Sequence, residues 1–269
     1  MDIKSLGLVA LLVTGLPVHG IAQSPPTSEE VNKANHPLTP QLTINLQDQY
    51  VSSFFGLNDW DSNEALLRGA LPHKLFGWPQ IFGVTVPIVT SPDLLTGSVT
   101  GLGDVEVFDV ILLKTGAVDL GIGPLLTIDS ATDERLGTGK WQAGAAGVAI
   151  VPQSWGLIGG IVKYQHSFAG EVDQPTQNNL QAQPFVTYNL PQGFYLRSSA
   201  IWEFDLERGD YFIPLGFGAG KVWRLESGTT LNLFVEPQWT MAYNGVIPQF
   251  QLLVGLYMQF PITRAEGQY

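Results

Sequence analysis

The chain has 269 residues, contains no cysteine and carries a formal net charge of −11 at pH 7. Without cysteine it can form no disulfide, thiolate metal site, cysteine nucleophile or lipid-modified N-terminal cysteine. The acidic balance argues against nucleic acid as a partner, because phosphate binding needs Lys and Arg. Charged residues make up only 14% of the chain, against a usual value of ~25%. Its mean hydropathy is +0.13, yet it has no apolar run of transmembrane-helix length.

Residues 1–22 have the pattern of an export signal. Lys4 supplies a positive start, residues 6–18 are mostly apolar, and Gly20, Ile21 and Ala22 are small or apolar residues before a cut ahead of Gln23. This order is typical of a signal peptide and is too short to span a bilayer comfortably. We therefore predict a cleaved signal peptide at 1–22.

Residues 23–41 are polar and contain four prolines. These are Pro25, Pro26, Pro37 and Pro40. Because proline interrupts both helices and strands, we predict an irregular periplasmic leader at 23–41. Such a segment could be a free tail or a plug that enters the rest of the protein.

From residue 42 to 262 the chain repeats runs that alternate apolar with polar or small residues. In the run near 229–241, Leu231, Leu233 and Val235 alternate with Asn232 and Glu236, and successive strand side chains point to opposite faces. The runs predict about twelve strands, near 42–56, 62–72, 79–90, 102–113, 117–128, 141–152, 155–168, 178–190, 193–204, 211–225, 229–241 and 247–261. The fold class is thus all-β, a transmembrane antiparallel β-barrel at 42–262 with a C-terminal tail at 263–269.

The connections alternate between short turns and long acidic loops. Short turns fall near 114–116, 152–154, 191–192 and 226–228, whereas residues 72–78 form a long connection where a short one is due. In an even-stranded barrel with periplasmic termini, long loops face outward from the cell and short turns inward. A soluble sandwich or lipocalin-like barrel also alternates, but it shields its apolar face inside. No helix or second hydrophobic segment is available to cover an outward apolar face here.

Several polar residues fall on the face opposite the apolar one. A charge at the bilayer midplane costs ~2–4 kcal/mol on the lipid face, so these side chains should point into a lumen. They either set selectivity or pair across the interior and hold it rigid. The lumen-lining candidates are Arg68, Asp119, Lys163, Gln181, Gln183, Arg197, Glu203, Glu236, Gln238 and Gln251.

Three glycines, Gly216, Gly218 and Gly220, share one strand face and are predicted to face the lumen, where they would relieve crowding. They form no dinucleotide fingerprint, because no helix follows them. Elsewhere the strand register is in conflict. Glu106 and Asp109 are three residues apart, so both cannot point inward from a regular strand. Lys221 falls on an apolar face, where it could extend toward the rim.

Metal and catalytic motifs are weak. Asp129, Ser130, Asp133 and Glu134 are oxygen-rich, but their spacing matches no standard calcium loop, and the glycine-containing segment 137–140 lacks the residues of a phosphate loop. We predict no metal and no cofactor. His166 and Ser167 are strand neighbours that point to opposite faces, so the sequence offers no nucleophile, base and orienting residue, and we predict that the protein is not an enzyme.

The central part of the chain resembles a known family. The segments GLGDVEVFDVILLKTG and TIDSATDERLGTGKW, followed by QPFVTYNLPQGFYLRSS and IPLGFGAGKVWRL, are similar to the family named for the meta-pathway of phenol degradation, outer-membrane transporters of Gram-negative bacteria. The resemblance covers about residues 42–260. It implies an outer-membrane barrel related to porins and hydrophobic-compound channels, and it brings neither a substrate nor a set of functional residues.

Together these features predict a porin-like channel in the cell outer membrane that passively admits small compounds, hydrophobic or aromatic ones among them. The alternative is a structural or binding barrel with a filled lumen and acidic surface loops. The expected partners are outer-membrane lipid, a small-molecule solute of unknown identity and the barrel-assembly machinery during biogenesis.

Overall fold

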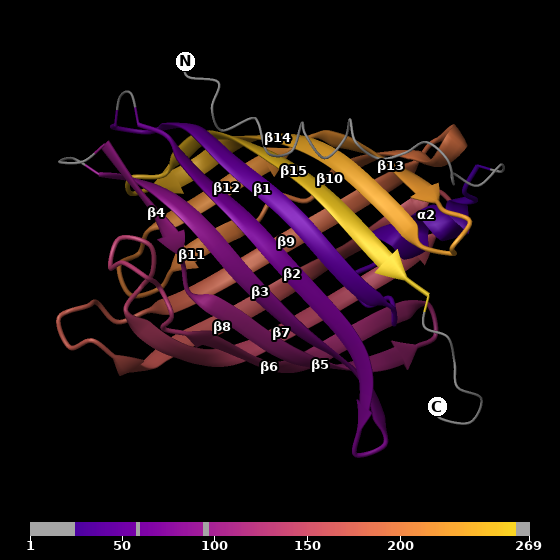
Figure 1. The fold of residues 1–269 in the computed structure, drawn as a ribbon, viewed down its shortest axis with the longest axis horizontal. Coiled ribbons are helices and arrows are strands. Elements are labelled where there is room, and N and C mark those ends of the chain that lie inside the picture. Colours follow the sequence, from indigo (N-terminus) through magenta and orange to yellow (C-terminus); the bar gives the residue numbers. More distant parts are fainter. Residues whose placement is uncertain (1–24, 58–59, 94–96, 262–269) are drawn as a thin grey trace.

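The computed structural model describes residues 25–57, 60–93 and 97–261, which form a closed antiparallel β-barrel with one helix, α2 (Ser28–Asn35), at one end (Figure 1). The predicted signal peptide at 1–22 and C-terminal tail at 263–269 lie outside the described residues. Within the described ranges, no helix is both long enough and apolar enough to cross a membrane.

The described part of the wall contains fifteen strands and a short 3-10 turn, η1 (Pro191–Gly193). In chain order the strands are β1 (Leu42–Phe54), β2 (Ser62–Leu75), β3 (Trp78–Asp93), β4 (Gly97–Leu102), β5 (Val105–Thr115), β6 (Val118–Ile128), β7 (Lys140–Gln153), β8 (Gly156–Gly170), β9 (Asn178–Asn189), β10 (Phe194–Ser198), β11 (Trp202–Asp205), β12 (Tyr211–Gly216), β13 (Gly218–Arg224), β14 (Thr230–Asn244) and β15 (Pro248–Phe260).

In three cases, two consecutive strands are the two halves of a single strand of the wall. β4 and β5 both pair with β3, β10 and β11 both pair with β9, and β12 and β13 both pair with β14. The wall therefore has twelve segments, and the predicted twelve-stranded antiparallel barrel is confirmed. β1 pairs with β15 from Leu42 opposite Phe260 to Phe54 opposite Pro248. This pairing closes the sheet into a barrel, in which β4 alone among the described strands has a single neighbour, β3.

The connection between β2 and β3 differs from the sequence prediction. The sequence predicted a long connection at 72–78, but β2 continues to Leu75 and β3 begins at Trp78. Phe76 and Gly77 alone form the turn, with φ of 50° and 86°, and two positive φ values suit the tight hairpins that match strand twist. This connection is therefore short, as the alternation of loop lengths requires.

The leader is also more ordered than the sequence predicted. Residues 28–35 are helical, not irregular. The prolines that suggested irregular structure flank this segment, and a helix tolerates proline just outside its ends. Thr27 caps the helix, since its Oγ1 accepts a hydrogen bond from the Glu30 N–H while the Glu30 carboxylate accepts one from the Thr27 N–H. This reciprocal pair is a capping box.

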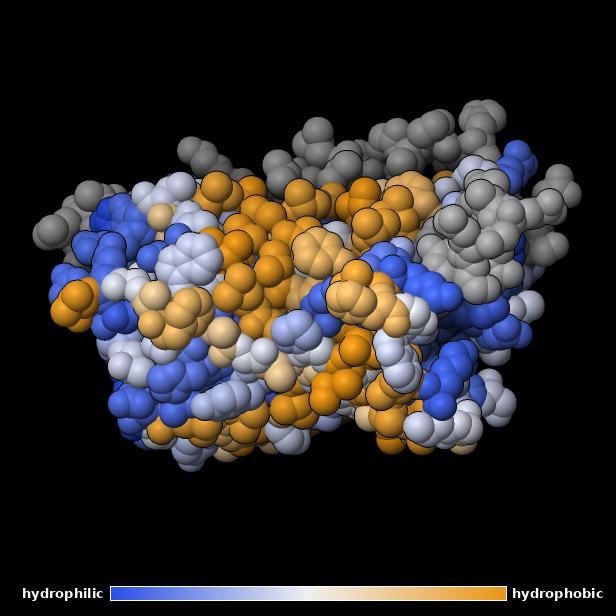
Figure 2. Space-filling view, turned by 90° about the horizontal axis from the view of Figure 1, so that it is seen from below, coloured by the Kyte–Doolittle hydropathy of each residue, from blue (hydrophilic) through white to orange (hydrophobic). Residues whose placement is uncertain are grey.

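The two faces of the wall differ in polarity. Large apolar side chains point outward and stay exposed, such as Leu71 at 51% and Ile122 at 56%, whereas Gln47, Gln238 and Gln251 point inward and are buried. Figure 2 shows one side of the molecule, where hydrophobic residues occupy much of the middle and hydrophilic residues gather toward both ends. The period-two pattern of the sequence thus becomes an apolar exterior around a polar interior.

Candidate functional site

The interior of the barrel holds a cavity of about 740 Å³. Side chains from the wall line it, together with residues 34–39 of the leader. Eight of the ten predicted lumen residues lie on its lining, namely Arg68, Lys163, Gln181, Gln183, Arg197, Glu203, Gln238 and Gln251. The other two contact interior groups, because Glu236 is covered by Arg197 and Ser199 and Asp119 contacts His36 of the leader.

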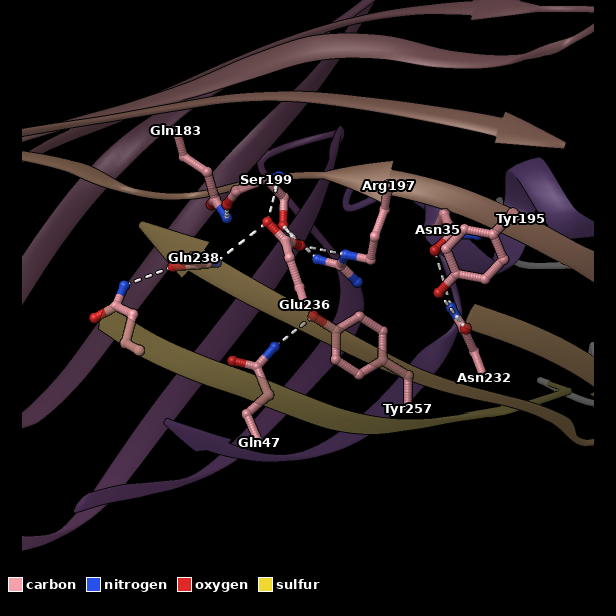
Figure 3. Close-up of polar contacts among 11 residues, drawn as sticks. Asn35, Gln47, Gln183, Tyr195, Arg197, Ser199, Asn232, Glu236, Gln238 and Tyr257 are labelled. Atoms are coloured by element: carbon pink, nitrogen blue, oxygen red, sulfur yellow. Dashed lines mark hydrogen bonds and ion pairs between the residues drawn. The ribbon is translucent and has the colours of Figure 1, made fainter. Parts of the chain in front are cut away.

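A buried ion pair joins two strands that are not neighbours. Arg197 on β10 donates from Nε to Glu236 Oε2 on β14 at 2.7 Å, and their side chains are 8% and 0% exposed (Figure 3). The Ser199 N–H and hydroxyl also donate to the Glu236 carboxylate, at 2.8 and 2.7 Å. The Arg197 guanidinium lies 3.6 Å from the centre of the Phe234 ring. The Glu236 charge is therefore compensated by one cation and several donors, as burial requires.

Amide side chains extend this cluster around the wall. The Gln238 amide donates to Glu236 at 3.2 Å, Gln251 donates to Gln238 at 2.5 Å, and Gln49 donates to Gln251 at 2.9 Å. The chain of contacts runs from β14 across β15 to β1 and is partly visible in Figure 3. It satisfies buried polar groups, which would otherwise be costly.

The predicted lumen glycines make room for these groups. A Cβ atom on Gly216 would lie 2.1 Å from Glu236 Oε1, and one on Gly220 would lie 2.4 Å from the Tyr195 ring. A Cβ on Gly218 would meet the Val235 carbonyl oxygen at 2.3 Å. These three positions on β12 and β13 lie between the strands that carry Arg197 and Glu236. Glycine there lets the ion pair pass over the intervening strand.

The structure resolves the two conflicts of strand register. Glu106 points into the lumen and accepts from Lys163 Nζ at 2.5 Å. Asp109, three residues later, is on the outer face, where its Oδ1 lies 2.9 Å from His73 Nε2. Lys221 is also on the outer face, 4.2 Å from the Phe194 ring centre and 5.4 Å from that of Trp223. Of these two outward charges, Asp109 thus contacts a histidine, and Lys221 lies over aromatic rings.

Helix α2 occupies one end of the lumen. Val31 and Ala34 are buried and pack with Tyr195, Phe234 and Leu253 of the wall. Polar contacts surround this cluster: the Asn232 amide donates to the Ala34 carbonyl at 3.2 Å and to Asn35 Oδ1 at 3.0 Å, the Asn189 amide donates to Asn32 Oδ1 at 2.8 Å, and Arg224 pairs with Glu30. No local pattern in the sequence indicates these contacts, because they join residues that are 157 to 198 positions apart.

The segment after the helix is held by His36 and Leu38. His36 Nε2 lies 3.0 Å from Asp119 Oδ2, and the Leu38 N–H donates to His36 Nδ1 at 3.1 Å. Nδ1 therefore carries no proton, and the neutral ring donates from Nε2 to Asp119. Leu38 packs among Val110, Ala146, Ile150 and Leu157. Burial lowers the pKa of His36, Asp119 opposes this shift, and the charge of Lys114 adds to it.

A second segment narrows the opposite end of the lumen. Residues 129–139 fold back over the wall, where Asp104 accepts hydrogen bonds from the N–H groups of Ser130, Ala131 and Thr138 and from the Thr138 hydroxyl. Leu136 in this loop is buried and lines the cavity. This loop contains the oxygen-rich residues that were compared with a calcium loop. It is organised by the Asp104 carboxylate, which accepts hydrogen bonds from the backbone N–H groups of the loop.

The described residues bring together no group of three His, Cys, Asp or Glu side chains that could hold a metal ion. His166 and Ser167 do not act as a pair either. The Ser167 hydroxyl accepts from the Gln177 N–H at 3.0 Å, and His166 Nδ1 lies 2.7 Å from the Ser167 backbone carbonyl oxygen. This geometry provides no contact between the histidine ring and the serine hydroxyl, which serine nucleophile chemistry needs.

Comparison with known proteins places the fold. No family model matches the chain, and no curated protein matches it. The chain is similar to the crystal structure of an outer-membrane channel from Pseudomonas putida F1, with a TM-score of 0.60 and 14% identity over 91% of this chain and 99% of that one. It is also similar to the NanC porin, with a TM-score of 0.53 and 11% identity over 82% of this chain and all of the porin.

The chain has the fold of an outer-membrane channel barrel. At these identities the likeness shows the fold and leaves solute and site residues open. Since no family model matches, membership of the meta-pathway family stays a prediction.

We predict that Glu236→Gln destabilises the barrel by ~3–5 kcal/mol, because it leaves the buried Arg197 charge uncompensated. The measurement is urea unfolding of the refolded protein, followed by tryptophan fluorescence. Glu207→Gln removes the same charge from an exposed loop and should change stability by less than about 0.5 kcal/mol. Equal losses in the two variants would show that the Arg197–Glu236 pair has no special structural role.

We also predict that acid releases residues 25–41 from the lumen. Because the pKa of His36 is lowered from 6.5, the released segment binds more protons than the seated one, so the seated form is most stable above pH 6.5 and weakens as the pH falls below it. Protonation of Nδ1 also breaks the Leu38 hydrogen bond. A spin label at Lys33→Cys should gain mobility between pH 8 and pH 5.5. The added change His36→Gln should abolish this gain, and an unchanged pH profile in that variant would exclude His36 as the cause.

Proposed function

We propose that this protein is an outer-membrane channel that passively admits small solutes and that residues 25–41 are its plug. The observation that carries the proposal is the combination of an apolar outer wall with a polar cavity enclosed by a continuous sheet. A closed barrel satisfies the backbone hydrogen bonds of its wall internally, which is what the hydrocarbon core of a membrane demands. The polar cavity would give solutes a route that avoids lipid.

The outer membrane is the location that best suits this wall. The outward side chains Leu67, Leu71 and Ile122 would contact lipid, and Lys221 lies three residues from the end of β13, where its long side chain can reach the headgroup region. We infer export through a cleaved signal peptide at 1–22 and insertion by the barrel-assembly machinery. The end that holds α2 would face the periplasm, and the acidic loops would face the exterior.

The proposed solutes are small molecules, hydrophobic or aromatic ones among them. The sequence resemblance to the phenol meta-pathway family supports this choice. So do the apolar side chains of Phe108, Val148, Ile161 and Phe185 in the lining, which are interspersed with amides. A twelve-stranded barrel is narrower than the open porins, so large solutes would not pass.

A second candidate is a structural or binding barrel whose lumen stays filled. The dense contacts of α2 favour it, since Val31 and Ala34 are almost wholly buried against the wall. The two functions differ in one respect. A channel requires residues 25–41 to move or to leave a path beside them, whereas a structural barrel requires them to stay.

The test is a reversible lock on the plug of the full chain. Asn35 Oδ1 lies 3.0 Å from the Asn232 amide, and the chain has no native cysteine, so Asn35→Cys with Asn232→Cys offers a single disulfide between plug and wall. We expect conductance in planar bilayers and solute uptake into liposomes to be low when the pair is oxidised and to recover on reduction.

The control is Thr90→Cys with Thr100→Cys, which are cross-strand neighbours at the rim of β3 and β4 with hydroxyls 2.9 Å apart. This lock leaves the plug free, so oxidation should not change conductance. Equal conductance of the plug variant in both states would show that residues 25–41 are not the gate. Absence of conductance and uptake in every state would favour the structural barrel.

A further inference from the structure

We infer that the lumen selects for cations and that small organic cations are the preferred solutes of the proposed channel. This inference rests on the proposed function and goes beyond it, because it assigns a charge class to the solute. It is drawn from the balance of charged groups along the cavity, from the end lined by β11 and β12 to the plug.

Carboxylates outnumber strong bases on the lining of the cavity. The acidic residues are Glu64, Asp104, Glu106, Glu203, Asp205 and Asp210, and the strong bases are Arg68, Lys163 and Arg197. His36 also lines the cavity, with a ring kept neutral by its contact with the Leu38 N–H. The lining is therefore net negative, and rings of Asp and Glu are what make pores favour cations.

Two of the three bases are engaged by carboxylates of the wall. Lys163 Nζ lies 2.5 Å from Glu106 Oε1, and Arg197 is paired with Glu236 beneath the lining. Such pairs present little net charge to a passing ion. Arg68 is the base that is left, and it lies on the same face of β2 as Glu64, four residues away. An anion would find no cluster of bases along this part of the lumen.

Glu203 extends the negative field across the lumen. It lies on β11, five strand segments from β2 around the barrel, and the Gln181 amide donates to its Oε1 at 3.3 Å. Asp210 stands nearer the opening, where it accepts from the Asn244 amide at 3.3 Å. A cation would thus meet a carboxylate both at the opening and within the lumen.

The lining also suits an organic cation. Phe212 lines the cavity directly opposite Glu203 on the paired strands β11 and β12, and the rings of Phe108 and Phe185 line it as well. Aromatic faces attract ammonium groups, and the same faces accept the ring of an aromatic amine. The combination of carboxylates and aromatic rings would favour a protonated amine over a carboxylate of similar size.

The experiment compares three aromatic solutes of nearly equal size and different charge. Full-length protein in liposomes is tested for uptake of benzylammonium, benzyl alcohol and benzoate, and the reversal potential is recorded across a KCl gradient in planar bilayers. We expect benzylammonium to enter fastest and benzoate slowest, and K⁺ to permeate more readily than Cl⁻. The preference should shrink between 0.1 and 1 M salt, as the Debye length falls from about 10 Å to about 3 Å.

Variants that remove single charges test which residues cause the preference for cations. Glu203→Gln should lower the ratio of K⁺ to Cl⁻ permeability about sevenfold, because one charge about 7 Å away in water changes the occupancy of each ion about 2.7-fold, in opposite directions. Arg68→Gln should raise the ratio by a similar factor. Glu207→Gln removes a charge from the exposed loop beside β11 and should leave the ratio unchanged. Heat-modified mobility on gels verifies that each variant is folded.

The outcomes separate the two claims. Uptake of all three solutes with benzoate as fast as benzylammonium would overturn the inference and leave the channel standing. A ratio that falls equally in Glu203→Gln and Glu207→Gln would also overturn it, because the effect would then come from the surface. No uptake of any solute and no conductance would overturn the proposed channel and the inference with it.

Discussion

The structure depends on the closure of β1 against β15. Once the first and last strands pair, each described strand of the wall except β4 has two neighbours, and the backbone donors and acceptors of the ladders are satisfied within the wall. Closure also divides the side chains into two sets, because the period of two sends alternate residues inside and outside. The apolar exterior and polar lumen are both consequences of this one constraint.

Closure forces polar groups into a confined interior, where each must find a partner. The Arg197–Glu236 pair, the Ser199 donors and the amides of Gln238, Gln251 and Gln49 satisfy one another across several strands. Such a network stabilises the protein only if every buried polar group in it has a hydrogen-bond partner, since a partly satisfied network is less stable than an apolar core. Glycines of β12 and β13 make this network possible, because a side chain at Gly216 or Gly218 would collide with Glu236 and one at Gly220 with the Tyr195 ring.

The segments at the two ends of the lumen are held by different kinds of contact. At one end, α2 is held mainly by apolar packing and by amide contacts to its C-terminal residues, with the His36–Asp119 contact beyond it. At the other, the loop at 129–139 is held by the carboxylate of Asp104 and by hydrogen bonds of Ser130 and Thr132 to the backbone of residues 102–105. The first arrangement buries Val31, Ala34 and Leu38 against apolar residues of the wall, so its release would expose apolar side chains on both sides of the contact. A segment that leaves and returns must offset this cost.

Much of the fold could be predicted from the sequence, because alternation is local. Leu231 to Met241 and Phe250 to Phe260 reveal their outward and inward faces without knowledge of any partner, and the twelve segments follow from the same pattern. The lumen candidates follow as well, since a strand face assigned to the interior places Arg197, Glu203 and Glu236 there together. Local pattern also placed three glycines on that face.

Tertiary structure decided what alternation leaves undetermined. Glu106 and Asp109 have the same chemistry, and only the pairing of β5 with its neighbours sent one to Lys163 and the other to His73. The prolines of the leader indicated where a helix could not form, but the capture of Val31 and Ala34 depends on Tyr195 and Phe234, far along the chain. The sequence by itself determined the barrel, because strand periodicity is a property of neighbouring residues. The plug and the partner of each lumen charge were decided by closure, which brings distant strands face to face.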